Sequence, residues 1–240
     1  MNRVHLAAIG AVLALTIAGC SEPERNGGVL AGGAYDANAM RTATDAARSS
    51  VVRIEVTGCD SSGSGTGFHT GGGRIVTNRH VVEGAVSVEV VADNGATRDA
   101  TGWRVSRTAD VAELMVTPAA TDRPLKFADI VPTPGDRVAV VGYPLGGPLT
   151  ISEGRIIPAA VSSRIASAEE SSELTSAGPL IGATTEVLPG NSGGPLLDAQ
   201  GHAVGLIFAF ARRDSTALAM NSRTTQEALA NAAALAPEAC

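Results

Sequence analysis

The sequence predicts an all-β protein, an antiparallel sandwich or pair of barrels, followed by one C-terminal helix. Beyond residue 50, apolar residues alternate with polar ones in short runs, which is typical of strands. Turn sequences rich in Gly, Asp and Asn separate these runs, and no long helical pattern lies between them. Helical periodicity with a start signal occurs only near the C-terminus.

The expected strands share this alternation or a continuous β-branched composition. They are residues 52–56, 74–78, 86–90, 111–116, 137–142, 149–156 and 203–210. Two of the separating sequences, ADNG (92–95) and DAQG (198–201), are typical of hairpin connections. We therefore expect neighbouring strands to pair in antiparallel fashion.

Two segments favour helix. Residues 36–49 have a helix-compatible composition with weak periodicity, and would cover one end of the domain. Thr224, followed three residues later by Glu227, forms a capping box in front of an Ala/Leu-rich helix that would reach about Ala236.

Composition limits the function classes. A chain of 240 residues with 44% hydrophobic content is sufficient for one sizeable core, so one domain is expected. A net charge of -6 provides no basic stripe for phosphate contacts, which disfavours a nucleic-acid partner. The sequence has neither a Walker-type loop nor a zinc-ligand cluster, so we expect no cofactor and no metal.

The N-terminus has the features of an export signal. Arg3 precedes an apolar run, residues 6–18, that is short for a membrane span. The run ends in LTIAGC (15–20), which resembles a bacterial lipobox, so Cys20 would become the lipidated first residue of a lipoprotein on the outer face of the cell membrane. The alternative is ordinary secretion with cleavage near Gly19.

The expected domain organisation follows from these features. Residues 1–19 form the lipoprotein signal peptide, residues 20–35 a flexible tether, and residues 36–240 the folded domain.

The strongest chemical motif is PGNSGGPL (189–196), which contains Ser192. A serine flanked by glycines is typical of a tight turn that exposes the hydroxyl group. The turn formed by Gly190, Asn191 and Ser192 would supply an oxyanion hole, with the backbone N–H groups of Gly190 and Ser192 converging on the developing charge. A plain Gly/Pro turn before a strand is the alternative.

A histidine and an aspartate complete a candidate triad. TNRHVV (77–82) places His80 where a β-type run ends, whereas His5 lies in the signal peptide, His69 in a Gly/Thr-rich loop and His202 after a turn. Asp110, in TADVAELMV (108–116), precedes the next strand and would orient the His80 ring. The order His80, Asp110, Ser192 gives weight to a signal that is weak at each position alone.

With these motifs the chain resembles the chymotrypsin-like serine peptidases over roughly residues 50–236. TNxHVV, DxAxLxV and GNSGGPL are most similar to the bacterial high-temperature-requirement proteases. GTGF (65–68), GYP (142–144) and the C-terminal cysteine are more similar still to membrane-anchored actinobacterial acid-resistance proteases. The resemblance implies two antiparallel six-stranded β-barrels with the active site between them, protein or peptide substrates, and the triad roles given above.

The resemblance also implies a substrate pocket. Glu186, six residues before Ser192, would lie near its base and favour Arg or Lys side chains. Alternatively, Glu186 is hydrogen-bonded elsewhere, or the strand carrying Phe208, Ala209 and Phe210 shortens the pocket and selects small or apolar side chains.

Two departures from the family pattern are expected. Too few residues follow Ser192 for a peptide-binding PDZ-type module. Arg79 replaces a small residue beside the base; it would either gate the cleft or, as we expect, point outward.

The motifs favour a serine endopeptidase that cleaves extracytoplasmic proteins through an acyl-enzyme. Two rival functions use the same fold: an inactive binding lipoprotein, and a non-peptidase acyl hydrolase. Retention of all three triad residues argues against the first, and a strand rather than a helix after Ser192 argues against an α/β-hydrolase elbow.

The cysteine count predicts a disulfide. With Cys20 assigned to lipid, Cys59 and Cys240 remain in an oxidising compartment, and neither has metal-type spacing to a histidine. Their pairing would tie the first barrel to the tail beyond the C-terminal helix.

Overall fold

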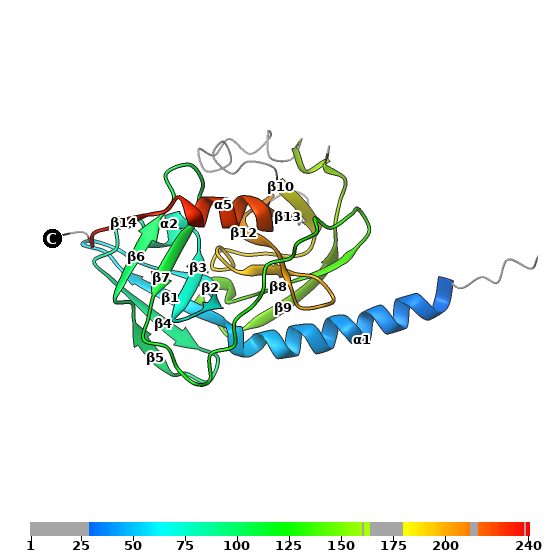
Figure 1. Ribbon diagram of the computed structural model, residues 1–240, viewed down its shortest axis with the longest axis horizontal. Coiled ribbons are helices and arrows are strands. Elements are labelled where there is room, and N and C mark those ends of the chain that lie inside the picture. The colour runs from blue at the N-terminus through cyan, green and yellow to red at the C-terminus, as the bar shows by residue number, and fades with distance from the viewer. Residues whose placement is uncertain (1–28, 160, 164–179, 212–215, 238) are drawn as a thin grey trace, which may run out of the picture.

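A computed structural model describes residues 29–159, 161–163, 180–211, 216–237 and 239–240. Two curled antiparallel sheets form half-barrels that pack together (Figure 1). In spatial order the first sheet contains β14 (Ala233–Leu235), β6 (Gly102–Val105), β7 (Ala112–Met115), β3 (Arg74–Thr77), β2 (Ser62–Gly71), β1 (Val51–Thr57), β4 (Ser87–Ala92) and β5 (Thr97–Asp99). The second contains β10 (Leu180–Thr184), β13 (Thr216–Asn221), β12 (Ala203–Ala211), β11 (Pro195–Leu197), β8 (Arg137–Gly142) and β9 (Thr150–Arg155).

The expected all-β architecture is confirmed, with one difference in strand number. The second sheet has six strands as expected, whereas the first has eight. Its two edge strands, β5 and β14, are three residues long, and each pairs with a single neighbour. Their sequences are too short to show a period of two, so only the pairing identifies them.

The N-terminal helix is longer than predicted. α1 spans Val29–Ala47 and continues into a 3-10 turn, Arg48–Ser50, so residues 29–35 of the expected tether are helical. Met40, Thr44 and Ala47 are buried at helical spacing, which seats the end of α1 on the domain. The signal peptide and Cys20 lie outside the described residues. Within the described part of the chain, no helix combines the length and hydrophobicity needed to span a membrane.

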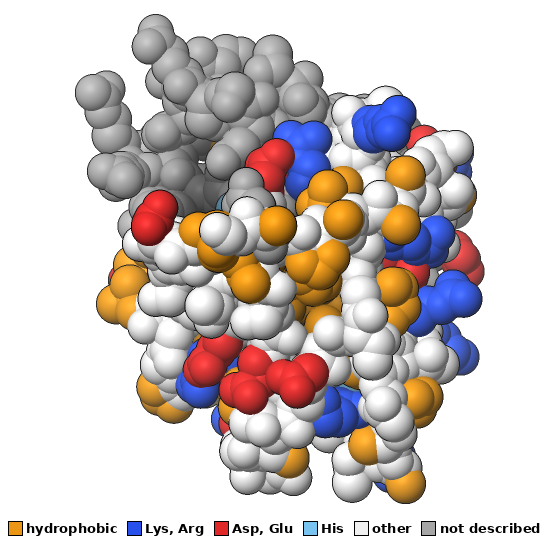
Figure 2. Space-filling model, turned by 90° about the vertical axis from the view of Figure 1, so that its left-hand side faces the viewer, with side chains coloured by type: hydrophobic (Ala, Val, Ile, Leu, Met, Phe, Trp, Pro, Cys, Tyr) orange, Lys and Arg blue, Asp and Glu red, His pale blue; other side chains and the backbone are white. Residues whose placement is uncertain are grey.

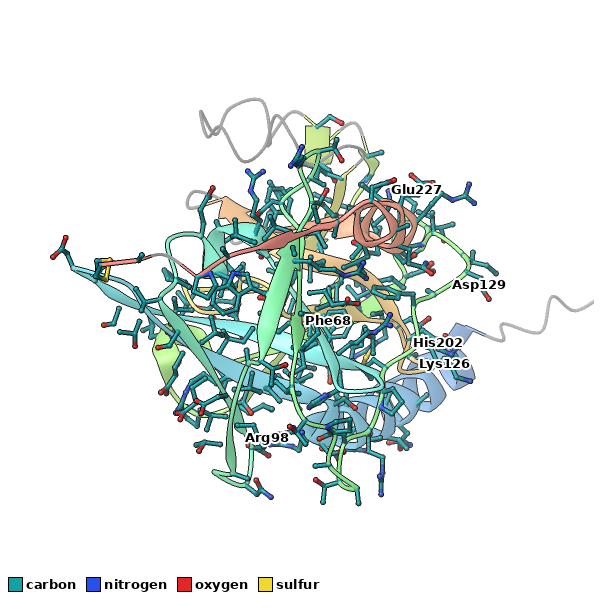
Figure 3. The ribbon with its side chains drawn as sticks, turned by 60° about the vertical axis from the view of Figure 1, so that its left-hand side comes forward. Phe68, Arg98, Lys126, Asp129, His202 and Glu227 are labelled. Carbon is teal, nitrogen blue, oxygen red and sulfur yellow. A yellow bond between two sulfur atoms is a disulfide. The ribbon has the colours of Figure 1, made fainter. Side chains whose placement is uncertain are left out.

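The core between the sheets is centred on Phe68 of β2, which is fully buried (Figure 3). Its ring packs edge-on against Phe127 with centroids 5.8 Å apart. Side chains from the second sheet, including Val141, Leu206 and Met220, belong to the same cluster. The two half-barrels therefore share a core, and this core fixes how their loops meet.

On the outer face of the first sheet, polar side chains alternate along the strand with the buried apolar ones. On β1, Arg53 and Glu55 flank the fully buried Ile54 and form an ion pair with 2.7 Å between Nη2 and Oε1. Figure 2 shows one face of the molecule, on which side chains of both charges lie among uncharged and hydrophobic ones.

The C-terminal helix is confirmed, but with different ends. α5 spans Ser222–Ala230, and its cap is Asn221, whose Oδ1 accepts the N–H of Thr224 at 2.8 Å. The predicted Thr224 capping box therefore lies inside the helix. The Ala/Leu sequence after Ala230 forms β14 on the edge of β6, because tertiary pairing overrides the helix propensity of alanine.

Cys59 and Cys240 form a disulfide with 5.5 Å between their Cα atoms, as the cysteine count predicts. The bridge lies at the end of the molecule opposite the start of α1 (Figure 3). It ties the chain after β14 to the loop after β1 across a sequence separation of 181 residues.

We expect that replacing both cysteines by serine lowers the free energy of unfolding by up to about 5 kcal/mol, because closing a loop of this length restricts the unfolded chain. Urea unfolding of the double variant against oxidised wild type measures the difference. Reduced wild type is the control and should match the variant. Two alkylatable thiols in the native wild type would contradict the bridge.

Candidate active site

His80 is held by Asp110 through two contacts. His80 lies in α2, a single helical turn spanning Arg79–Val82, and not at the strand end that the sequence predicted. Its backbone N–H donates to Asp110 Oδ1 at 2.9 Å, and its Nδ1 lies 2.7 Å from Asp110 Oδ2. Because a carboxylate accepts hydrogen bonds, Nδ1 carries the proton in this contact and Nε2 is the unprotonated ring nitrogen.

Asp110 is buried, with 1% of its side chain exposed, and two neighbours fix its position. Ser106 Oγ accepts the N–H groups of Thr108 and Ala109 at 3.2 Å, which closes the turn before β7. Asn78 Nδ2 donates to the carbonyl oxygen of Asp110 at 2.9 Å. Asn78 was not predicted as a site residue, although it lies in the same motif as His80.

The Ser192 turn depends on glycine at two positions. Gly190 and Gly193 have φ values of 96° and 84°, in the left-handed region. A Cβ on Gly193 would come within 2.2 Å of Thr66 O. The Gly193 N–H donates to Ile207 O at 2.7 Å, which ties the turn to β12.

Strand β2 brings the serine and the histidine together. The Thr66 N–H donates to Ser192 O at 2.8 Å, and Thr77 Oγ1, three residues before His80, donates to Thr66 O at 2.8 Å. A Cβ on Gly65 would lie 2.7 Å from Val81 Cγ1 and 3.3 Å from Ser192 O. The backbones that carry Ser192 and His80 are therefore packed against the same two residues of β2. The GTGF sequence was the available signal for this contact.

The backbone N–H groups of Gly190, Asn191 and Ser192 differ in whether they are already hydrogen-bonded. The N–H of Asn191 donates to Leu188 O at 3.0 Å, so Asn191 has no free backbone donor. Among the described residues, no hydrogen bond uses the N–H of Gly190 or Ser192. These two donors remain available to an oxyanion.

The loop 143–146 and Thr66 both hydrogen-bond the start of this turn. The Leu145 N–H donates to Pro189 O at 2.6 Å, and Thr66 Oγ1 donates to Gly190 O at 2.6 Å. Leu145 has φ 56°, the one positive value among the described non-glycine residues. Burial raises the pKa of Tyr143 to about 12, so its hydroxyl group stays neutral beside the site.

The residues predicted to line the substrate pocket lie on two elements. Glu186 is exposed in the connection between β10 and β11. Phe208, on β12, is 2% exposed and belongs to the core cluster between the sheets. The side chains of Ala209 and Phe210 lie outside the described residues.

Arg79 does not point freely outward. It lines a small cavity with Leu235 and Ala236 of the C-terminal tail, and its Nε is buried with no hydrogen-bond partner among the described residues.

The sequence predicted His69 to lie in a loop, but its side chain is buried and it belongs to strand β2. Its Nε2 lies 3.2 Å from Arg98 Nη2 and 3.5 Å from Asp122 Oδ1. Desolvation lowers the pKa of His69 despite the nearby Asp122, so the ring is neutral and serves packing. Within the described part of the chain, no three His, Cys, Asp or Glu side chains are grouped to hold a metal ion.

Comparisons with known proteins agree with this geometry. The profile of the trypsin-like peptidase domain matches residues 65–206. The serine protease Rv3671c of Mycobacterium tuberculosis is 36% identical over 168 residues, which cover 69% of this chain and 41% of the relative. The serine protease Do-like HtrA of Lactobacillus helveticus is 32% identical over 151 residues, which cover 61% of this chain and 35% of the relative. This chain therefore matches less than half the length of these relatives.

A solved structure extends the likeness to the fold. The active form of the Rv3671c protease from M. tuberculosis aligns with a TM-score of 0.68 at 30% identity, covering 82% of this chain and 86% of that chain.

Proposed function

This chain belongs to the trypsin-like peptidase family, and on that premise we propose that it is a serine endopeptidase with Ser192 as nucleophile, His80 as general base and Asp110 as the residue that orients His80. The contact of Asp110 with both Nδ1 and the backbone N–H of His80 is the observation that carries the proposal. The two contacts together fix the orientation of the His80 ring and place its proton on Nδ1.

The reaction proceeds through an acyl-enzyme. His80 Nε2 takes the proton of Ser192 Oγ as the oxygen attacks the scissile carbonyl carbon, and the resulting oxyanion accepts hydrogen bonds from the N–H groups of Gly190 and Ser192. His80 then gives the proton to the leaving amine nitrogen, and the C–N bond breaks. Water, activated by His80, hydrolyses the ester and restores Ser192. Asp110 stays ionised throughout and stabilises the imidazolium.

A fluorophosphonate probe followed by casein digestion tests the proposal against its rivals. Labelling of Ser192 together with casein cleavage is the expected result. Labelling with ester hydrolysis but no casein cleavage would assign an acyl hydrolase. Absence of labelling in folded protein would assign an inactive binding protein.

We also propose that the protein acts outside the cytoplasm, anchored through a lipid on Cys20. The sequence LTIAGC supports this, because a lipobox places cysteine at the first position after signal cleavage. Mass spectrometry of the mature N-terminal peptide tests the modification. An unmodified peptide starting elsewhere would leave ordinary secretion as the route.

We expect Glu186 to favour Arg or Lys before the cleaved bond. Glu186 is exposed, so its carboxylate is available to a cationic side chain. A peptide-library profile should show basic enrichment that Glu186→Gln loses by about tenfold and that Glu153→Gln, an exposed control, retains. A profile without basic enrichment in the wild type would point to the shortened apolar pocket instead.

A further inference from the structure

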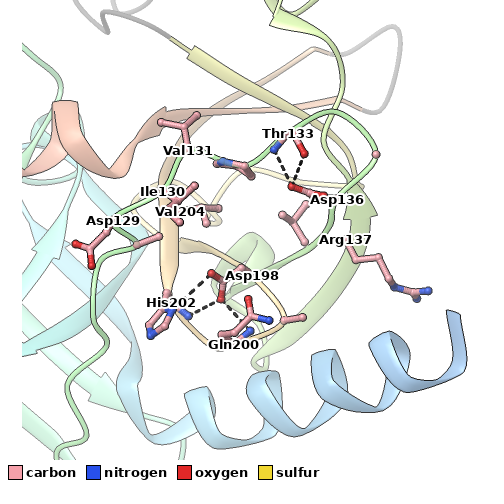
Figure 4. A pocket seen from close by; sticks show the side chains of 15 residues that line it. Asp129, Ile130, Val131, Thr133, Asp136, Arg137, Asp198, Gln200, His202 and Val204 are labelled. Atoms are coloured by element: carbon pink, nitrogen blue, oxygen red, sulfur yellow. Dashed lines mark hydrogen bonds and ion pairs between the residues drawn. The ribbon is translucent and has the colours of Figure 1, made fainter. Parts of the chain in front are cut away.

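A groove of about 590 Å³ lies between residues 128–138 and the turn that joins β11 to β12 (Figure 4). This volume falls in the range of ligand-binding clefts. Asp198, which lines the groove, follows Ser192 by six residues. Six extended residues span at most about 20 Å, so Asp198 lies within that distance of the proposed nucleophile. Figure 3 places Asp129 and His202 of this groove on the side of the molecule away from the disulfide.

The walls of the groove are preorganised. Asp198 Oδ1 accepts the N–H groups of Gln200 and His202 at 2.9 and 2.8 Å. On the other side, Asp136 Oδ2 accepts the N–H of Thr133 at 2.7 Å and its hydroxyl group at 2.9 Å. Because side-chain contacts already hold both turns, a ligand would bind without a large cost of ordering them.

The rim of the groove is apolar and exposed. Ile130 and Val131 are consecutive, with 79% and 52% of their surface accessible, and they stand above the buried Val204. Figure 4 shows both side chains on one side of the groove, with Asp198 and His202 on the other and α1 below. Adjacent exposed aliphatic residues over a cavity are typical of a recognition surface.

The charged groups in the groove are mainly acidic. Asp129, Asp136 and Asp198 line it, and His202 Nδ1 lies 3.6 Å from Asp198 Oδ2. Among the described lining residues, Arg137 is the one Lys or Arg. Arg137 pairs with Glu153 at 2.9 Å and extends away from the groove (Figure 4). The polar part of the surface therefore favours a cation.

We propose that this groove is a second substrate-binding site, which takes an extended polypeptide segment with an aliphatic residue next to Lys or Arg. The aliphatic side chain would contact Ile130 and Val131, and the cation would lie near Asp129. The site would hold part of a protein substrate remote from the cleaved bond, so this role rests on the proposed endopeptidase function.

Charge complementarity favours this occupant over two others. A two-fold contact with a second copy would set the same aspartates against each other, since both subunits use the same patch. An anionic lipid surface would be repelled in the same way. A polypeptide segment with aliphatic and basic side chains can contact both the apolar rim and the acidic walls.

Direct binding can be measured on the full chain carrying Ser192→Ala, which needs no catalysis. The probe is a fluorescein-labelled peptide of Ile-Lys repeats, followed by fluorescence anisotropy, with an Ile-Glu peptide as its counterpart. We expect Ile130→Ser to weaken Ile-Lys binding at least tenfold and Asp129→Asn at least threefold. Asp60→Asn, an equal charge change beside Cys59, should leave binding unchanged.

Activity gives the second readout. With Ser192 present, Ile130→Ser should lower kcat/KM for casein while leaving hydrolysis of a short ester substrate unchanged. If wild-type protein hydrolyses neither substrate, the endopeptidase proposal fails while the binding result still stands.

Three results would overturn the second site. These are equal Ile-Lys binding in Ile130→Ser, Asp129→Asn and the parent, loss of a dimer on Ile130→Ser, and Ile130-dependent binding to phosphatidylglycerol vesicles. Sedimentation equilibrium and vesicle co-sedimentation provide the last two measurements.

Discussion

Replacing Ser192 by alanine is expected to lower the rate of peptide hydrolysis by about 10⁴-fold or more. The substitution removes the nucleophilic oxygen, and the oxyanion donors of Gly190 and Ser192 remain because they are backbone groups. The turn itself is held by contacts that do not involve the hydroxyl group, including the Thr66 N–H to Ser192 O bond of 2.8 Å. The fold should therefore survive.

Single-turnover cleavage of a chromogenic peptide measures the loss, and thermal unfolding checks the fold. We expect a change in Tm of no more than about 2 °C, since substitutions that break no buried contact alter stability by about 0.5 kcal/mol or less. The double variant with His80→Ala should lose little more activity, because the two residues act as a unit. Wild-type proteolysis in Ser192→Ala would refute the assigned nucleophile.

Asp110→Asn is expected to lower kcat by about 10⁴-fold through the tautomer of His80. The backbone N–H of His80 donates to Oδ1 at 2.9 Å, so an asparagine would keep its oxygen at that position. Its amide group would then face Nδ1, at the place where Oδ2 now lies 2.7 Å away. Nδ1 would become an acceptor and Nε2 would carry the proton, so the ring could no longer accept the proton of Ser192.

Asp122→Asn is the matched control for this variant. Asp122 also lies near a histidine, His69, at 3.5 Å, but its carboxylate is bound to Arg98 at 2.8 Å. We expect it to reduce stability and leave kcat within about threefold, since this ion pair takes no part in the proposed reaction. An Asp110→Asn enzyme that retains a tenth or more of wild-type kcat would remove Asp110 from the triad.

Local pattern predicted seven of the fourteen strands among the described residues, and it predicted the candidate triad. The runs at 52–56, 74–78 and 137–142 became β1, β3 and β8, because alternating or continuous β-branched residues report burial directly. β2 was missed because its Gly/Ser/Thr sequence has no apolar alternation. Its glycines are explained only by neighbours distant in sequence, such as Val81 and Ser192 beside Gly65.

The family resemblance selected a pair of barrels over a sandwich. The amino-acid sequence alone determined the β-rich class, the order of His80, Asp110 and Ser192, and the pairing of Cys59 with Cys240. Each of these follows from residue type and spacing, which are local or countable properties. Tertiary structure alone decided that the Asn191 N–H bonds Leu188 O, that Asn78 and Thr66 contact the segments carrying Asp110 and Ser192, and that the residues after Ala230 form β14. The partner of a backbone N–H or of a sheet edge is the group that lies beside it in the folded chain. That group can be distant in sequence, so the local residue pattern does not predict it.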